Sequence, residues 1–471
     1  MGKFNFLKNL HMSDRLCKKS VLAAYIVLFI LTFSYLARIG YTTSDDVQIA
    51  QQGFVEAFHV AVQAGRLTWL VALPSTILSE TQGSLWFAKI LRIIWVVTLF
   101  HSSYLLLRAK LTPDKSLFVL LFPIIFFINN WDHHAFGAYP GLALYGLSCF
   151  FYSIYFLNKY LLQGRQKYQA LSCAFFFASF VSELFPTLFI FLLIYPTGPL
   201  KNRLKALVPH FFAGLVFYYL YTQFKSEAPT HQLGFNLQAI KTWMIYSYSQ
   251  IYDLRDVSVA ALRELKLTFH FKYIASLLCI LYIFVKSFED KESAKSSNLV
   301  GFILWWVLIS AFINIPVALT YTYQEWVSRG SRGYLYSAIS NYSASISLGL
   351  LTMVVLTKYK NLLLRFIALV IILYIYSSHT IASYHIYHQQ MYSHNRWNYM
   401  DGLARKQYFK PNYCYLAPWL FEINGLVIIR TDDYWDKYLL KNWGLKARII
   451  KNPQSVDCEA VIVLDDLRSK P

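Results

Sequence analysis

Long apolar runs recur along almost all of this 471-residue chain, and they constrain its fold more than any other feature. About 20 apolar residues in a helix match the hydrocarbon thickness of a bilayer. Hydrophobic residues make up 56% of the sequence and charged residues 15%, a balance outside the range of soluble domains. The sequence therefore predicts an all-α polytopic membrane protein.

The apolar runs predict about eleven membrane-spanning helices. They cover about 21–39, 85–107, 117–128, 137–157, two short halves within 168–195, 207–223, 271–285, 299–319, 338–356 and 362–376. Pro186, close after Glu183, divides the run from 168 to 195 into an outward and an inward half. Residues 41–83 instead have apolar residues at helical spacing among polar ones, which predicts helices lying in the membrane interface.

Lysine and arginine residues gather in the segments between alternate spans. The net charge of +19 is therefore spread over short clusters and forms no single patch for nucleic acid. Basic loops of this kind are typical of the cytoplasmic side of a membrane. We expect the N-terminus in the cytoplasm, and an odd number of spans places the C-terminus outside a bacterial cytoplasmic membrane.

No further span follows residue 376, so we predict a membrane core over 1–376 and a small outer α/β domain over 377–471. Its sequence predicts helices at 381–408 and 433–443 and strands at 425–429, 447–450 and 460–464. Cys414 and Cys458 both fall in this domain. A disulfide in an oxidising compartment and two unpaired thiols remain open alternatives.

Two adjacent acids, Asp45 and Asp46, directly follow the first predicted span. Neighbouring carboxylates repel each other and lose hydration near a bilayer, so a proton, a metal ion or a cationic partner would offset their cost. Alternatively, Asp46 caps the next helix. A carboxylate at the outer rim can take a proton from an acceptor hydroxyl while cations hold a phosphate leaving group.

The chain resembles the GT-C superfamily of membrane glycosyltransferases in three features. These are the acidic pair after the first span, the interfacial helices in the same loop and the outer C-terminal domain. The resemblance covers the span pattern of most of the chain. It implies transfer of a sugar from a polyprenyl-phosphate donor to a cell-envelope glycan or lipid acceptor. Asp45 or Asp46 would be the general base or orient the acceptor, with Asp132 and Glu183 as further catalytic acids. Glu183 departs from the pattern, because many relatives carry a basic residue there.

The same resemblance implies a site for the lipid phosphate, to which arginine offers bidentate contacts. The candidate cations are Arg66, Lys89, Arg92, Arg329 and Arg332. Lys89 and Arg92 have an equally good alternative, because such side chains also extend to lipid headgroups. The superfamily includes metal-dependent and metal-independent enzymes, so a divalent cation, Mg²⁺ or Mn²⁺, on Asp46, Asp132 and His133 stays open.

Two other functions remain as alternatives. A transporter or flippase of lipid-linked sugars would be expected to show repeated halves with broken helices near the midplane, and the sequence shows no convincing repeat. A glycan polymerase or ligase is usually built around arginines in large outer loops, and Arg329 and Arg332 fit that alternative.

Overall fold

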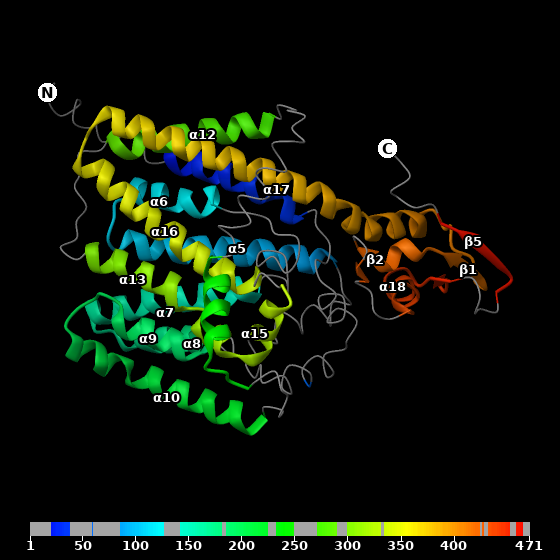
Figure 1. Ribbon diagram of the computed structural model, residues 1–471, viewed down its shortest axis with the longest axis horizontal. Coiled ribbons are helices and arrows are strands. Elements are labelled where there is room, and N and C mark those ends of the chain that lie inside the picture. The colour runs from blue at the N-terminus through cyan, green and yellow to red at the C-terminus, as the bar shows by residue number, and fades with distance from the viewer. Residues whose placement is uncertain are drawn as a thin grey trace, which may run out of the picture.

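The fold is a helical bundle joined to a small α/β tail by one long helix, as the computed structural model shows (Figure 1). Six described helices are long and apolar enough to cross a membrane: Ser20–Ala37, Lys89–Arg108, Phe271–Phe288, Leu299–Leu319, Ser337–Lys358 and Leu362–Ile381. The structure describes residues 20–37, 59, 85–126, 142–180, 185–224, 232–248, 271–289, 299–330, 334–423, 426–427, 432–452 and 458–464. The chain is a membrane-embedded helical protein, as predicted.

The bundle begins with a helix over residues 20–33, which η1 (Ser34–Ala37) extends. The other labelled helices are α5 (Leu85–Arg108), α6 (Pro113–Ile125), α7 (Leu142–Gln163), α8 (Gln166–Ala178), α9 (Phe185–Ile194), α10 (Leu200–Phe224), α12 (Phe271–Glu289), α13 (Leu299–Phe312), α14 (Ile315–Leu319), α15 (Tyr321–Ser328), α16 (Tyr334–Lys358) and α17 (Leu362–Arg405).

The predicted count of eleven spans is not confirmed. The six helices of spanning length coincide with the predicted spans one, two and eight to eleven. The predicted spans three to seven correspond to α6–α10, and among these α6, α8 and α9 have only 13, 13 and 10 residues. At about 1.5 Å per residue they are shorter than the roughly 30 Å of a hydrocarbon core. The gap between α8 and α9 falls where the sequence predicted a division.

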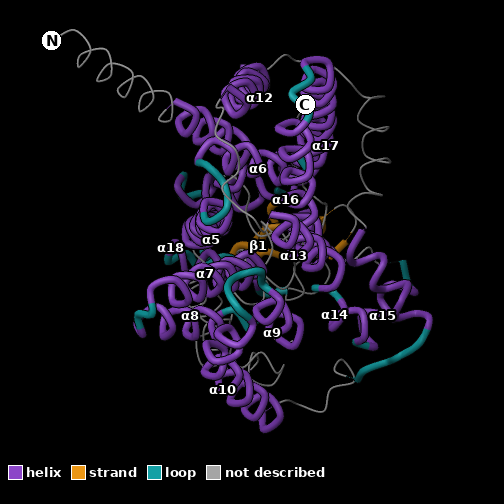
Figure 2. The backbone as a smooth tube through the Cα atoms, turned by 90° about the vertical axis from the view of Figure 1, so that its left-hand side faces the viewer, coloured by secondary structure: helices purple, strands orange, loops and turns teal. Residues whose placement is uncertain are grey.

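Helix α6 lies inside the bundle, which explains why its length does not match a bilayer. Every residue from Asp114 to Ile125 is buried. It contacts α5, α12, α16 and α17 (Figure 2). On α16, Gly349 permits a close approach, since a Cβ at this position would lie 2.9 Å from the ring of Phe122. Other helices therefore shield α6 from lipid.

The predicted ninth span is broken at Asn314, between α13 and α14. This buried side chain donates from Nδ2 to the carbonyl of Tyr246 and to Oγ of Ser340, both at 2.8 Å. The segment after Leu319, between two predicted spans, forms the helix α15. An isolated antiparallel bridge joins Leu233 to Thr320 just before α15.

Where the sequence predicted two helices, at 362–376 and 381–408, the structure has the single 44-residue helix α17. Asn361 caps its start by accepting hydrogen bonds from backbone N–H groups of the first turn. Tyr376 belongs to the core of the bundle, whereas Trp397 and Met400 belong to a separate core in the tail. The boundary placed at 376/377 therefore falls inside a continuous helix that enters both cores.

The tail contains a three-stranded parallel sheet in the order β4-β1-β5. Its strands are β1 (Tyr413–Leu416), β4 (Arg448–Ile450) and β5 (Ala460–Val463). Helix α18 (Tyr434–Trp443) lies between β1 and β4 in the chain, and parallel strands need such a crossover. Gly444 ends α18 in the left-handed region, at φ 66°. The predicted 425–429 strand is represented by β3 (Leu426–Val427), which pairs with β2 (Glu422–Ile423); β1 was not predicted.

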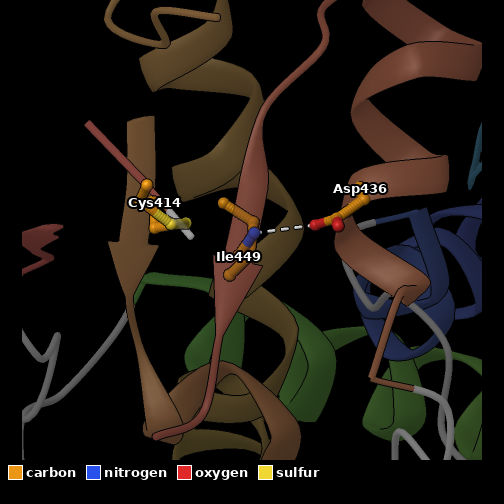
Figure 3. The surroundings of a disulfide bond; sticks show 4 residues. Cys414, Asp436 and Ile449 are labelled. Carbon is orange, nitrogen blue, oxygen red and sulfur yellow. Dashed lines mark hydrogen bonds between the residues drawn. A yellow bond between two sulfur atoms is a disulfide. The ribbon is translucent and has the colours of Figure 1, made fainter. Parts of the chain in front are cut away.

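A disulfide joins Cys414 in β1 to Cys458, which lies two residues before β5 (Figure 3). The two Cα atoms are 5.8 Å apart, within the range that disulfides require. The bond therefore crosslinks two neighbouring strands of the tail sheet. It also closes a long segment of chain that contains α18 and β4.

Replacing both cysteines, Cys414→Ala with Cys458→Ala, should lower the free energy of unfolding of the tail by roughly 2–4 kcal/mol, because the bond closes a segment of 44 residues. Limited proteolysis of the tail in increasing urea measures this change. Cys149→Ala, at a buried free cysteine of α7, is the control and should leave the tail unchanged. Equal proteolysis of the oxidised and reduced protein would contradict the prediction.

Asp436 on α18 holds the edge strand β4, since its Oδ1 accepts a hydrogen bond of 2.7 Å from the backbone N–H of Ile449 (Figure 3). Burial of the carboxyl raises its pKa from 3.8 to about 6, against the opposing effects of the Ile449 N–H and of Arg448. The folded tail therefore binds this proton more tightly than the unfolded chain does. The resulting stability is fully present below pH 3.8 and is lost as the pH rises through about 6.

Asp436→Asn should remove this pH dependence, because an amide oxygen still accepts the Ile449 N–H but does not titrate. Between pH 4 and pH 7 the wild-type tail should lose about 1 kcal/mol more than the variant, after allowance for solvent screening. Urea unfolding at a series of pH values measures the difference. Glu459→Gln, at an exposed carboxyl just before β5, is the control and should retain the wild-type profile. Parallel profiles for wild type and Asp436→Asn would contradict the assignment.

Candidate functional site

Several elements meet at the end of the bundle from which α17 leaves, which we term the tail end. Lys89, near the start of α5, lies within electrostatic range of Asp401 in the last turns of α17. Just past α6, the ring of Phe126 meets His379 of α17 edge to face, with centroids 5.8 Å apart. The backbone carbonyl of Phe126 accepts a hydrogen bond of 3.3 Å from Nδ2 of Asn341 on α16. The start of α5 therefore lies beside the last turns of α17, whereas the end of α6 and the first turns of α16 lie beside α17 at His379, roughly 33 Å earlier along that helix.

Lys89 and Arg92 form a pair of cations on one face of α5, because residues three apart are neighbours on a helix. Arg92 is 0% exposed and Lys89 is half-buried. The two charges act on each other, and Arg92 also lies within electrostatic range of Tyr35 in η1. Like charges close together in a medium of low dielectric repel strongly. Two cations on one helix face can both donate to the oxygens of a single phosphate group.

Asp401 is a candidate site residue that the sequence analysis missed. Its Oδ1 accepts two hydrogen bonds from α18, one of 2.8 Å from the Tyr438 hydroxyl and one of 2.9 Å from Nε1 of Trp443. Both donors are neutral groups, and they orient the carboxylate. Together with Lys89 and Arg92, Asp401 gives this part of the described chain two basic side chains and one acidic one. Only the folded path of α17 brings this acid near α5, so no local sequence pattern indicated it.

Of the predicted site residues, Lys89, Arg92 and Arg329 lie in the described part of the chain. Arg329 follows α15, and its Nη2 donates to Oε1 of Glu325 at 2.5 Å in an exposed pair four residues apart. An exposed pair of this kind contributes little to stability. Seven predicted residues lie outside the described residues: Asp45, Asp46, Arg66, Asp132, His133, Glu183 and Arg332.

The described elements that flank these seven residues can still be placed. Asp45 comes eight residues after η1, and η1 adjoins Arg92 through Tyr35. Asp132 comes six residues after Phe126, which contacts α16 and α17. Arg332 lies between α15 and α16. The flanking ends of η1, α6 and α16 therefore all lie at the tail end.

The start of α9, two residues after Glu183 in the sequence, also lies toward the tail end. At the opposite end of α9, Nη1 of Arg203 donates to the carbonyls of Leu193 and Tyr195, at 3.0 and 2.5 Å. Helix α9 also contacts α14. Helix α14 directly follows Asn314, whose side chain is hydrogen-bonded to Ser340 on α16. The start of α9 is thus the end nearer the cation pair.

A second buried polar cluster joins α7, α8 and α10. Oγ of Ser172 is 2.8 Å from Nε2 of His210 and donates to the carbonyl of Ser153, also at 2.8 Å. All three residues are 0% exposed. Hydrogen bonds between helices are a common means of association within membranes, and complete burial keeps substrates away. We therefore assign this Ser-His pair to helix packing.

Comparison with known proteins adds no family to these observations. No protein-family model matches the chain, and no curated protein or solved structure is significantly similar to it. The function must therefore be argued from the residues themselves.

Neutralising the cation pair should weaken binding of a lipid phosphate, because each cation contributes a charge-assisted contact in a site of low dielectric. We expect Lys89→Gln to raise the dissociation constant of polyprenyl phosphate about tenfold and Arg92→Gln about a hundredfold, or roughly 1.4 and 2.7 kcal/mol. Titration of the purified protein in nanodiscs, followed by tryptophan fluorescence, measures both.

Arg108→Gln, at the other end of α5, is the matched control and should bind as wild type does. Because Arg92 is buried, its replacement risks misfolding, and the half-buried Lys89 provides the independent test. Wild-type affinity in a folded Lys89→Gln protein would refute the anion site.

Proposed function

We propose that the protein is a membrane glycosyltransferase, which moves a sugar from a polyprenyl-phosphate donor to a glycan or lipid acceptor at the tail end of the bundle. One observation carries the proposal: a buried arginine and a half-buried lysine share a face of α5 where the elements flanking the predicted acids also end. It supports a site in which cations for a phosphate act together with carboxylates from the adjoining segments. The acceptor class follows from the resemblance described above.

The cation pair would act on the leaving group. As the bond between the sugar C1 and the phosphate oxygen breaks, its electron pair stays on that oxygen and the phosphate gains negative charge. Fixed cations interact more strongly with this growing charge than with the intact donor, and such differential stabilisation lowers the barrier. Arg92, with its planar guanidinium, is suited to two phosphate oxygens at once. Asp401 would keep Lys89 oriented without neutralising both cations.

The acids would act on the acceptor. A fully extended chain limits Asp45 to within roughly 29 Å of Ala37 and Asp132 to within roughly 22 Å of Phe126. Both of these segments start from described elements at the tail end. In the proposed step, Asp45 or Asp46 takes the proton from the acceptor hydroxyl as the hydroxyl oxygen attacks C1. Glu183 is proposed as a further acid, from the break between α8 and α9.

A divalent cation, Mg²⁺ or Mn²⁺, is the alternative to a purely side-chain mechanism. Its proposed ligands Asp46, Asp132 and His133 lie outside the described residues. Among the residues that the structure describes, no three His, Cys, Asp or Glu side chains form a group suited to a metal ion.

We propose that the tail lies on the outer side of a bacterial cytoplasmic membrane, with the N-terminus inside. The disulfide between Cys414 and Cys458 supports this orientation, because such bonds persist in oxidising compartments. In contrast, the free cysteines among the described residues, Cys149, Cys173 and Cys279, lie on bundle helices. Basic clusters between alternate spans give the same orientation.

A flippase of lipid-linked sugars is the second candidate, favoured by the break between α13 and α14. Transporters commonly place interrupted helices at their binding sites. The break at Asn314, however, is bonded to Ser340 in the second turn of α16, so it lies toward the tail end rather than at the midplane. Arg329 and Arg332 also keep a glycan polymerase or ligase as a variant of the same transfer chemistry.

Asp45→Asn and Asp46→Asn should separate these functions. Loss of the proton acceptor should lower transfer by about 10²–10⁴-fold in at least one variant, with donor binding retained. Proteoliposomes supplied with a panel of polyprenyl-phosphate sugars, with released polyprenyl phosphate measured by mass spectrometry, give the readout. Asp433→Asn is the control, since this exposed acid belongs to the tail.

Undiminished transfer in both variants would remove the acidic pair from the mechanism. Movement of intact donor across the membrane without release of polyprenyl phosphate would instead establish the flippase.

A further inference from the structure

A helix over residues 237–248 runs across the bundle instead of along it. Figure 1 shows this helix, coloured bright green, crossing the direction of α13 and α16. Three side-chain hydrogen bonds to backbone carbonyls hold it to the α13–α15 segment. They run from Trp243 Nε1 to Ala311 at 2.6 Å, from Asn314 Nδ2 to Tyr246 at 2.8 Å, and from Gln238 Nε2 to Gln324 at 3.1 Å. We call it the crosswise helix.

The crosswise helix has two different faces. Its inner face is buried and carries Ala239, Thr242, Tyr246 and Ser247. Its outer face exposes a stripe of large apolar side chains with helical spacing: Leu237 at 84%, Ile240 at 54%, Met244 at 55% and Tyr248 at 38%. Lys241 is exposed within the same stripe. A continuous apolar stripe on an outer surface indicates an interaction site.

The apolar stripe is continuous with a surface that faces lipid. The Trp243 ring stacks on Phe312 of α13, with centroids 6.3 Å apart and the ring planes at 10°. Phe312, Leu308 and Leu304 are themselves exposed on α13, which belongs to a helix of membrane-spanning length. Exposed apolar residues of such a helix contact acyl chains, so the stripe extends that contact onto the crosswise helix.

Aromatic residues near the crosswise helix mark a level in the membrane. Tyr321 and Trp326 of α15 are 52% and 48% exposed, and the bridge from Leu233 to Thr320 ties α15 to the segment before the crosswise helix. Tyrosine and tryptophan are enriched where acyl chains meet headgroups. An exposed lysine within an apolar stripe fits the same level, because its stem lies along apolar chains while its ammonium reaches the phosphates.

We propose that the crosswise helix is an in-plane membrane anchor, with its apolar stripe in the boundary between acyl chains and headgroups and with Lys241 at the lipid phosphates. The orientation across the spans, the apolar face and the continuity with α13 all match an interfacial helix. The anchor holds the Asn314 break and α15 at the level of the headgroups. Its position does not depend on the chemistry proposed for Lys89 and Arg92.

Site-directed spin labelling of the full chain in nanodiscs tests the anchor. Ile240→Cys and Met244→Cys are made in a background in which Cys17, Cys149, Cys173 and Cys279 are alanine, and each carries a nitroxide. Power saturation compares the accessibility of the label to oxygen, which partitions into lipid, and to a water-soluble nickel complex. Leu304→Cys on α13 serves as the lipid reference. Leu440→Cys, 50% exposed on α18, serves as the water reference.

We expect both labels to have an oxygen-to-nickel ratio several-fold above that at Leu440 and below that at Leu304, since the boundary is shallower than the hydrocarbon centre. A ratio equal to that at Leu440 would place the stripe in water and overturn the proposal. Poor accessibility to both reagents would show that protein, such as a second copy of the chain, covers the stripe, and would also overturn it. If one variant fails to insert, Leu237→Cys on the same stripe replaces it.

Discussion

The burial of Arg92 next to Lys89 is the constraint that shapes the tail end of this protein. An arginine at the centre of a bilayer costs about 2.5–3.5 kcal/mol even when its side chain can reach water. Here a second cation lies on the same helix face and adds repulsion, and Asp401, more than 300 residues away in the chain, lies within electrostatic range of Lys89. The proposed chemistry depends on this pair of cations.

Asp401 reaches α5 because α17 does not stop at the edge of the bundle. The helix has 44 residues, about 66 Å at 1.5 Å per residue, and its two ends belong to different hydrophobic cores. Trp443 and Tyr438 then fix the carboxylate from α18. The tail is therefore part of the candidate site as well as an appendage, since it supplies both the acid and the groups that orient it.

The sequence predicted the helices that meet lipid better than those that do not. A run of about 20 apolar residues has few alternatives to spanning a bilayer, so six predicted spans reappear at nearly the same residues. The run that became α6 was ambiguous, because a helix surrounded by other helices needs an apolar surface but no fixed length. Strand β1 has only four residues, Tyr413 to Leu416, which is too few for a pattern. Lys89 and Arg92 could be identified from the sequence, because they are charged residues in an apolar run. Asp401 could be identified only from the fold.

The continuous helix α17 extends well beyond its apolar segment. About 24 residues, or roughly 36 Å, extend from Ile381 to Arg405 beyond the apolar segment. Spanning helices tilt when the thickness of the surrounding bilayer changes. A tilt of about 5° at the membrane would displace the far end of such a rod by roughly 3 Å, about the length of a hydrogen bond. The thickness of the host membrane would thereby adjust the separation between Asp401 and Lys89.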